Sequence, residues 1–169
     1  MREENAFFSN LIVDENNAKA VEGAKYICNL LLNGDTSQTK NGLIFSGNRG
    51  SGKTYIAVSV INEFNRNEPL NDSVIREIIK AQDNGFFDDF GVRINSKCRF
   101  IKEKDVIQLS EKYNYKENTS PIDEFKNARI LVVDDVGTSY CDSKKVMSIL
   151  FDLFDYRYSQ GLSTIITTN

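Results

Sequence analysis

The hydrophobic positions of the 169-residue chain fall into short apolar runs separated by longer amphipathic segments. The runs LIFS, CRFI, ILVVD and STIITT have the length and the apolar or β-branched character of strands. We therefore predict strands at residues 43–46, 98–101, 130–134 and 163–168. The first of these is bounded by turn residues, which is typical of a strand buried on both faces.

The segments between these runs carry apolar residues at helical spacing. We predict helices at residues 16–32, 53–65, 104–114 and 143–160, and a short helix capped by Ser120 with Pro121 at its first position. The residues expected to face inward are Val21, Ala24, Cys28, Leu31, Ala57, Val60, Ile61, Phe64, Val106, Leu109, Tyr113, Val146, Ile149, Leu150 and Leu153. Strands that alternate with helices predict a parallel sheet covered on both faces, a three-layer α/β sandwich.

Residues 66–97 interrupt this alternation. The stretch NDSVIREIIKAQDNG has the pattern of a capped helix, and FFDDFG that of an aromatic and acidic turn. We expect an insert here within a single domain that spans residues 1–169, because the chain is too short to argue for two domains.

Composition narrows the class of protein. Hydrophobic residues at 40% and charged residues at 27% are ordinary for a folded soluble protein and exclude a mainly disordered chain. Histidine is absent, which excludes mechanisms that need an imidazole base. The three cysteines lack CxxC spacing, so we expect reduced thiols. Without an apolar leader or a run of membrane-spanning length, we expect a cytoplasmic protein with no membrane partner.

The net charge of −3 creates no field across the whole chain that would attract nucleic acid. Any contact with DNA would need a local basic patch. Lys97, Arg99, Lys102 and Lys104 cluster around the second predicted strand and the helix after it, and they could form a stripe that contacts phosphates. A solvated basic face is the alternative.

A glycine-rich stretch, GNRGSGKT at residues 47–54, fits the P-loop pattern G-x-x-x-x-G-K-[ST] between a predicted strand and helix. Its glycines let successive N–H groups point at phosphate oxygens, helped by the positive end of the helix. We expect Lys53 to reach the β- and γ-phosphates of ATP and Thr54 to ligate Mg²⁺. The expected nucleotide-binding residues are Gly47, Asn48, Arg49, Gly50, Ser51, Gly52, Lys53, Thr54 and Tyr55.

The sequence ILVVDDVG supplies the carboxylate that such a site needs. Its apolar strand should bring Asp134 to the carboxyl edge of the sheet beside the P-loop, where it would serve the metal. Asp135 is the candidate base that polarises the attacking water. Asn169 ends a strand expected to lie between the P-loop strand and the Asp134 strand, where its amide could hold the γ-phosphate or the lytic water.

These three elements resemble the AAA+ P-loop ATPases, and more closely the DnaC/DnaI helicase loaders and the related IstB transposition ATPases. The resemblance rests on NGLIFSGNRGSGKTYIAVSVINEF, ARILVVDDVGTSY and ILFDLFDYRYSQGLSTIITTN, and covers residues 7–169 except the insert. It implies that Asp134 and Asp135 form the Walker B pair and that Asn169 is sensor 1. It also implies ATP bound between neighbouring copies of the chain, a replicative helicase as partner, and single-stranded DNA as a further partner.

The chain departs from this family after Asn169. The fifth strand, the arginine finger and the helical lid with its sensor 2 arginine do not follow, so we expect a fragment whose P-loop strand is a bare sheet edge. Arg157 is a candidate finger, but its place at a helix end favours a surface or interface salt bridge. Phe7 and Phe8 match a lead-in that lies near adenine in such proteins, and core packing is an equal alternative for them.

The main hypothesis is an ATPase of the helicase-loader type that acts in DNA replication and hydrolyses ATP weakly alone, because no cis arginine stabilises the transition state. An IstB-like transposition helper is a second hypothesis. A third is a nucleotide-dependent interaction module with negligible turnover. A small-molecule P-loop kinase is less favoured, since neither a lid nor acceptor-site arginines are visible.

Overall fold

A computed structural model describes residues 6–34, 42–67, 98–111, 121–138 and 143–169 of the chain. In chain order its elements are η2 (Phe8–Asn10), α1 (Ala18–Leu32), β1 (Leu43–Ser46), α2 (Lys53–Asn67), β2 (Cys98–Lys102), α4 (Glu103–Glu111), α5 (Pro121–Asn127), β3 (Ile130–Val136), α6 (Ser143–Ser159) and β4 (Ser163–Thr168). Most of the expected insert, together with Lys97, Tyr113, Ser120 and Cys141, lies outside the described residues.

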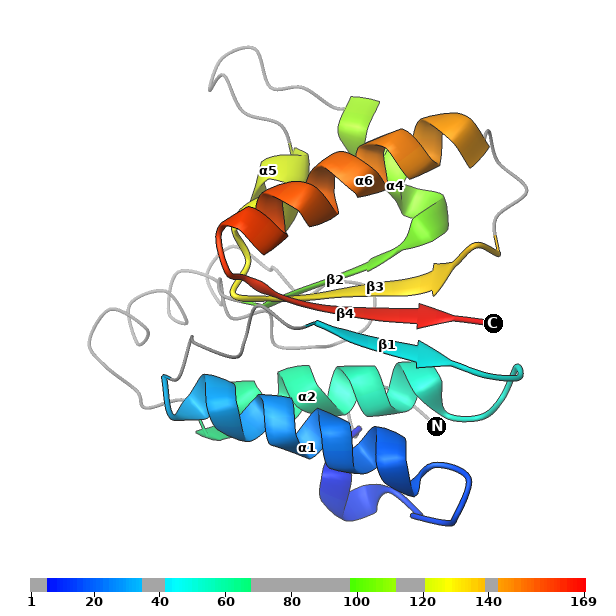
Figure 1. Cartoon of the computed structure of the whole chain (residues 1–169), viewed down its shortest axis with the longest axis vertical. Helices are drawn as coiled ribbons and strands as arrows, with labels where there is room; N and C mark the ends of the chain where they lie inside the picture. Colours follow the sequence, from blue (N-terminus) through cyan, green and yellow to red (C-terminus); the bar gives the residue numbers. More distant parts are fainter. Residues whose placement is uncertain (1–5, 35–41, 68–97, 112–120, 139–142) are drawn as a thin grey trace, which may run out of the picture.

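The four described strands form one parallel sheet in the order β1-β4-β3-β2. The last strand of the chain therefore lies between the P-loop strand and the strand that carries Asp134, as the sequence predicts. In Figure 1, α1 and α2 cover one face of the sheet, and α4, α5 and α6 cover the other. The predicted three-layer α/β sandwich is confirmed.

Strand β3 shows why the sheet has a core on each side. Ile130 and Val132 pack with the residues of α1 and α2, whereas Leu131 and Val133 pack with those of α4 and α6. All four side chains are fully buried. Alternate residues of a strand point to opposite faces, so a continuous apolar run is what a strand between two helical layers requires.

The predicted inward residues of the helices are largely confirmed. All those named for α1 and α2 are buried. In α4 and α6 the buried ones are Val106, Val146, Leu150 and Leu153, while Leu109 and Ile149 are half-buried. Cys28 lies in the α1–α2 core, and burial raises the pKa of its thiol to about 12. Cys28 and Cys98 are both free and buried, so the expectation of reduced thiols holds for these two residues. No helix in the described ranges is long and apolar enough to cross a membrane.

Strand β1 differs from its prediction. It was expected to be buried on both faces, but its Ile44 side chain is 69% exposed, and only Phe45 is buried. Because β1 lies at an edge of the described sheet, Phe45 packs into the α1–α2 core, while none of the described helices covers the opposite face at Ile44. The edge position itself agrees with the bare sheet edge that the resemblance implies. The apolar run of four residues does not distinguish an edge strand from a central one.

Arg157 also corrects a prediction, because it forms no surface or interface salt bridge among the described residues. Its side chain is completely buried. Its guanidinium donates hydrogen bonds to the main-chain oxygens of Phe125, Lys126, Ala128 and Ser163 and to the hydroxyl of Thr164. Arg157 thus fastens the C-terminal end of α6 to the end of α5 and the start of β4. Burial lowers the pKa of the guanidinium to about 10, which leaves it charged at neutral pH.

Candidate nucleotide-binding site

The glycine-rich loop joins β1 to α2 in a backbone conformation that only some residues tolerate. Gly50 and Gly52 have φ angles of 80° and 84°, in the left-handed region that other residues rarely enter. The Ser51 N–H donates to the Asn48 carbonyl at 3.3 Å, and the first helical turn starts with the Ile56 N–H on the Gly52 carbonyl at 2.9 Å. The loop is therefore a tight turn that leads directly into the N-terminus of a helix.

Lys53 lies at the start of α2 and folds back over the loop. Its ammonium donates to the carbonyls of Gly47 at 2.7 Å and Asn48 at 2.9 Å, and to Oδ1 of Asn169 at 3.0 Å. None of the carboxylates in the described ranges lies within ion-pair distance of it. Because no carboxylate of these ranges is paired with it, Lys53 adds its positive charge to the positive end of the α2 dipole. The start of α2 therefore attracts an anion.

Asp134 is 1% exposed and lies beside the first turn of α2. Its Oδ1 accepts two hydrogen bonds, from Oγ1 of Thr54 at 2.7 Å and from Oγ1 of Thr167 at 2.6 Å. The predicted approach of Thr54 to Asp134 is thus observed across 80 positions of sequence. A hydroxyl and a carboxylate are hard oxygen ligands of the kind that Mg²⁺ prefers. The residues present therefore fit a magnesium site.

Asp135, the candidate base, is exposed and has a left-handed φ of 59°. Its main chain is held on both sides. The Asp135 N–H donates to Oγ1 of Thr167 at 2.9 Å, and the Asp135 carbonyl accepts from the N–H of Thr138 at 3.2 Å and from its hydroxyl at 2.6 Å. The carboxylate itself accepts no hydrogen bond from any described residue, so it is open to solvent at the edge where Asp134 lies.

Two residues of this edge were missed by the sequence analysis. Thr167 bonds both aspartates, and Glu103, a buried carboxylate at the start of α4, accepts the N–H groups of Gly137 at 3.1 Å and Thr138 at 3.2 Å. The alternation of STIITT carries a signal for Thr167, because it puts that residue on the same face as the buried Ile165. For Glu103 we find no signal in the sequence, since an acid in the first turn of a helix is usually explained by the dipole.

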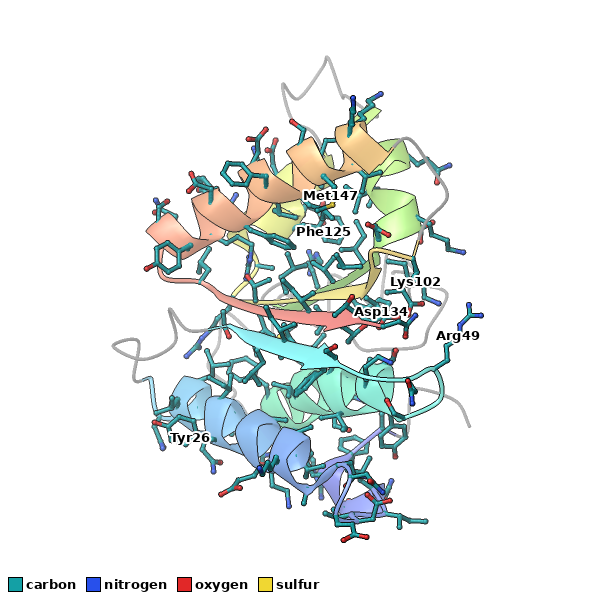
Figure 2. The ribbon with its side chains drawn as sticks, turned by 45° about the vertical axis from the view of Figure 1, so that its right-hand side comes forward. Tyr26, Arg49, Lys102, Phe125, Asp134 and Met147 are labelled. Carbon is teal, nitrogen blue, oxygen red and sulfur yellow. The ribbon has the colours of Figure 1, made fainter. Side chains whose placement is uncertain are left out.

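The other predicted residues lie around this centre. Figure 2 shows Arg49 and Asp134 at the same end of the sheet, with the exposed Arg49 side chain reaching outward from the loop. Tyr55 is half-buried and packs against the α1–α2 core. Phe8 also packs against this core, whereas Phe7 lies under the guanidinium of Arg66, 5.7 Å from the ring centroid. Core packing therefore accounts for Phe8, and a contact of Phe7 with adenine stays a prediction.

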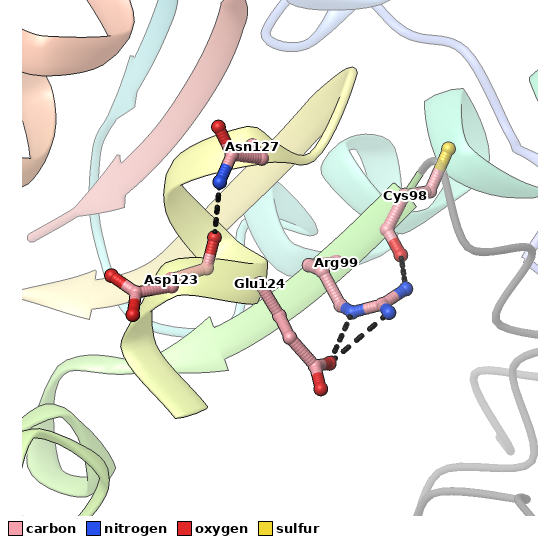
Figure 3. A network of polar contacts seen from close by, with 5 residues as sticks. All are labelled: Cys98, Arg99, Asp123, Glu124 and Asn127. Carbon is pink, nitrogen blue, oxygen red and sulfur yellow. Dashed lines mark hydrogen bonds and ion pairs between the residues drawn. The ribbon is translucent and has the colours of Figure 1, made fainter. Parts of the chain in front are cut away.

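The structure removes Arg99 from the basic stripe predicted around β2. Arg99 forms an ion pair with Glu124, with 3.1 Å between Nη2 and Oε2, and also donates to its neighbour's carbonyl at Cys98 (Figure 3). A guanidinium held in this way by α5 is not a free contact for phosphate. Lys104 is exposed and Lys102 is half-buried, so the structure leaves a smaller basic surface than the sequence suggests.

Solved structures of replication proteins are among those that this chain resembles. The chain matches the structure of DnaI with a TM-score of 0.66 and 19% identity, over 99% of this chain and 73% of that one. It matches the DnaC helicase loader with a TM-score of 0.63 and 22% identity, over 99% and 78% of the two chains. It matches AMPPCP-bound DnaA from Aquifex aeolicus with a TM-score of 0.64 and 18% identity, over 97% and 41%.

The fold is that of an AAA+ P-loop ATPase domain. At these identities the similarity establishes the fold alone. The chain spans about two fifths of the length of the DNA replication initiation proteins that it matches. No protein-family model matches the sequence, and no curated protein is significantly similar to it.

Proposed function

We propose that this AAA+ domain binds ATP with Mg²⁺ and hydrolyses it weakly, as an ATPase of the helicase-loader type in DNA replication. The proposal rests above all on one observation. Lys53 and Thr54, adjacent in sequence, contact Asn169 and Asp134 respectively, at 3.0 and 2.7 Å. The basic, hydroxyl, acidic and amide groups that ATP hydrolysis requires therefore meet at the carboxyl edge of one parallel sheet, where such sheets bind their ligands.

The chemistry of each side chain suggests its role in ATP binding and hydrolysis. The loop amides and the Lys53 ammonium would hold the β- and γ-phosphates. Thr54 and Asp134 would hold Mg²⁺, which when bound neutralises phosphate charge. Asp135, with an open carboxylate, would accept a proton from the attacking water. Asn169 would orient the γ-phosphate or this water through its amide.

Weak turnover follows from where the arginines lie. Negative charge on the transferring phosphoryl group is best stabilised by a nearby guanidinium. Arg157 cannot provide it, because it is buried among the carbonyls at the opposite end of β4 from Asn169. Arg99 is occupied by Glu124, and the exposed side chain of Arg49 reaches outward from the loop. We therefore expect a second chain or partner to supply the missing positive charge.

The helicase-loader assignment is supported by the similarity to DnaC and DnaI and by the segments DDVGTSY and DYRYSQG of the sequence. To test it, phosphate release by this chain is measured alone, with a hexameric replicative helicase, with single-stranded DNA, and with a transposase of the kind that an IstB-like ATPase assists. We expect slow release alone and ATP-dependent association with the helicase. A matched sample of the Lys53→Ala variant controls for contaminating ATPases.

Each alternative function has its own outcome in this experiment. ATP-dependent association with the transposase and none with the helicase would replace the loader by a transposition helper. Association that follows ATP with no phosphate release in any mixture would show an interaction module. A chain that neither binds ATP nor associates with either partner would contradict the proposal as a whole.

A further inference from the structure

The two aspartates occupy an irregularity in the sheet. Strands β3 and β4 pair in register up to Val133 and Ile166, and pairing resumes between Val136 and Thr168. Asp134 and Asp135 therefore stand opposite a single residue of β4, Thr167. Two residues facing one define a β-bulge, a feature that bends a strand and redirects a side chain, often beside functional sites.

The hydroxyl of Thr167 fills the gap that the bulge creates. Its Oγ1 lies 2.9 Å from the Asp135 nitrogen and 2.6 Å from Oδ1 of Asp134. A main-chain N–H can only donate, so Oγ1 accepts that bond and gives its single proton to the carboxylate. Thr167 is completely buried, so water has no access to replace either bond.

These contacts leave Asp134 with a defined free oxygen. Both of its hydroxyl donors, Thr54 and Thr167, bond to Oδ1. Its second oxygen, Oδ2, has no hydrogen-bond partner in the part of the chain that the structure describes. With Oδ1 fixed from α2 on one side and from β4 on the other, the carboxylate cannot rotate without breaking a short bond.

We propose that Thr167 is a positioning residue for the magnesium site. Its hydroxyl locks the bulge so that Asp134 presents Oδ2 to the metal, and it holds Asp135 in its left-handed conformation. The inference rests on the proposed function, because it assigns a role to Thr167 only in relation to a metal held by Thr54 and Asp134. Partners that orient metal ligands in this way typically change metal affinity by about 10- to 100-fold when they are removed.

The test uses Thr167→Val, which keeps the shape of the side chain and removes the hydroxyl. Calorimetry measures ATP binding over a series of Mg²⁺ concentrations and in EDTA, and thermal unfolding is followed in parallel. We expect the Mg²⁺ concentration for half-maximal binding to rise about 10-fold, with binding in EDTA unchanged. Thr167→Ser restores the hydroxyl and is expected to restore the Mg²⁺ dependence.

Thr168→Val is the matched control. Thr168 is the next residue of β4, and its hydroxyl donates to the Val136 carbonyl at 2.7 Å instead of a carboxylate. Its loss should lower stability and leave the Mg²⁺ dependence as in the wild type. If Thr167→Val does not fold, Thr167→Ala is measured by the same criteria.

The outcomes separate this inference from the function it depends on. Wild-type binding that depends on Mg²⁺, together with an identical dependence in Thr167→Val or its alanine substitute, would overturn the role of Thr167 alone. An equal loss in Thr168→Val would also overturn it, because a general strain in β4 would then explain the effect. Absence of Mg²⁺-dependent binding in the wild type would overturn both proposals.

Discussion

The hydroxyl of Thr54 donates a hydrogen bond of 2.7 Å to Oδ1 of Asp134. The first residue belongs to the opening turn of α2 and the second to the end of β3. This contact joins the P-loop to the neighbouring bulge, so the two candidate metal ligands are already in place in the folded chain. Because these ligands are already ordered, metal binding loses little free energy in ordering them.

Replacing Lys53 by alanine is expected to weaken ATP binding by about 10- to 100-fold, since a hydrogen bond to a charged group contributes about 1.5–3 kcal/mol. The three acceptors of Lys53 are exposed or half-buried main-chain and amide oxygens, so water can replace the ammonium and the fold should survive. Calorimetry with ATP and Mg²⁺ measures the change, and circular dichroism checks the fold.

Lys126→Ala is the control for the lost charge. Lys126 lies on α5 and pairs only loosely with Asp123, with 3.9 Å between Nζ and Oδ1. The Lys126→Ala variant should bind ATP as the wild type does. Equal losses in the two variants would mean that Lys53 acts through the overall charge of the domain and not through a contact with phosphate.

Asp135→Asn is expected to slow phosphate release by about 100-fold, the lower end of what a general base contributes. ATP affinity should stay unchanged, because the Asp135 carboxylate bonds no described residue and only its main chain is held in the bulge. Single-turnover hydrolysis and equilibrium binding measure the two quantities separately. Unchanged phosphate release, with partner binding that still follows ATP, would refute a catalytic role for this carboxylate.

Gly42→Ala is expected to destabilise the domain by about 1–3 kcal/mol, the usual cost of overpacking. A Cβ at this position would lie 2.3 Å from the carbonyl oxygen of Thr164, so the start of β1 would have to move away from β4. The free energy of unfolding in urea measures the effect. A stability equal to that of the wild type would mean that β1 moves to make room for the added Cβ at little cost in free energy.

Gly23→Ala is the matched control for Gly42→Ala, and it is expected to raise the stability of the domain. Gly23 lies within α1, where an added Cβ would meet only the Cδ2 atom of Leu43 at an ordinary 3.7 Å. Alanine should therefore stabilise the domain by about 0.5–1 kcal/mol. If both glycine variants lose stability, the close approach at Gly42 does not explain the first result.

Arg157→Leu is expected to destabilise the domain by at least about 3 kcal/mol, because each buried acceptor left without a donor costs about 1–3 kcal/mol. Four main-chain oxygens lose their donor in this variant. The free energy of unfolding in urea measures the effect. Arg66→Leu is the control, because Arg66 is exposed at the end of α2. Its free energy of unfolding should change by less than about 1 kcal/mol. Similar losses for both arginines would contradict the structural role of Arg157.

The sequence predicts the sheet and the position of its main polar groups well, because both follow from local patterns. Short apolar runs alternating with helical periodicity give a parallel sheet, and the strand order then places Asn169 beside Lys53 and Asp134 beside Thr54. The motif also indicates the contact between Thr54 and Asp134. These features depend on residue type and spacing, which the sequence shows directly.

The remaining features depend on which strand lies at an edge and on which polar groups are buried. Ile44 is exposed because no helix in the part of the chain that the structure describes covers its side of β1, and the apolar run LIFS does not indicate this. Arg157 continues the inward stripe of Val146, Leu150 and Leu153 at helical spacing, so its burial could have been predicted. Its charge and its place at a helix end favoured the surface instead. The bulge at Asp134 and Asp135 is set by the pairing register with β4, which the sequence of one strand does not contain.

We propose that Thr54 and Asp134 hold Mg²⁺ for a nucleotide bound at the P-loop. Calorimetric titration of the 169-residue chain with an ATP analogue, at increasing Mg²⁺ concentrations, tests it most directly. We expect one binding site whose affinity rises with Mg²⁺ until it saturates, and a much flatter rise in Thr54→Val. A folded wild-type sample that takes up no nucleotide, or takes it up equally well in EDTA, would refute a magnesium site at these two residues.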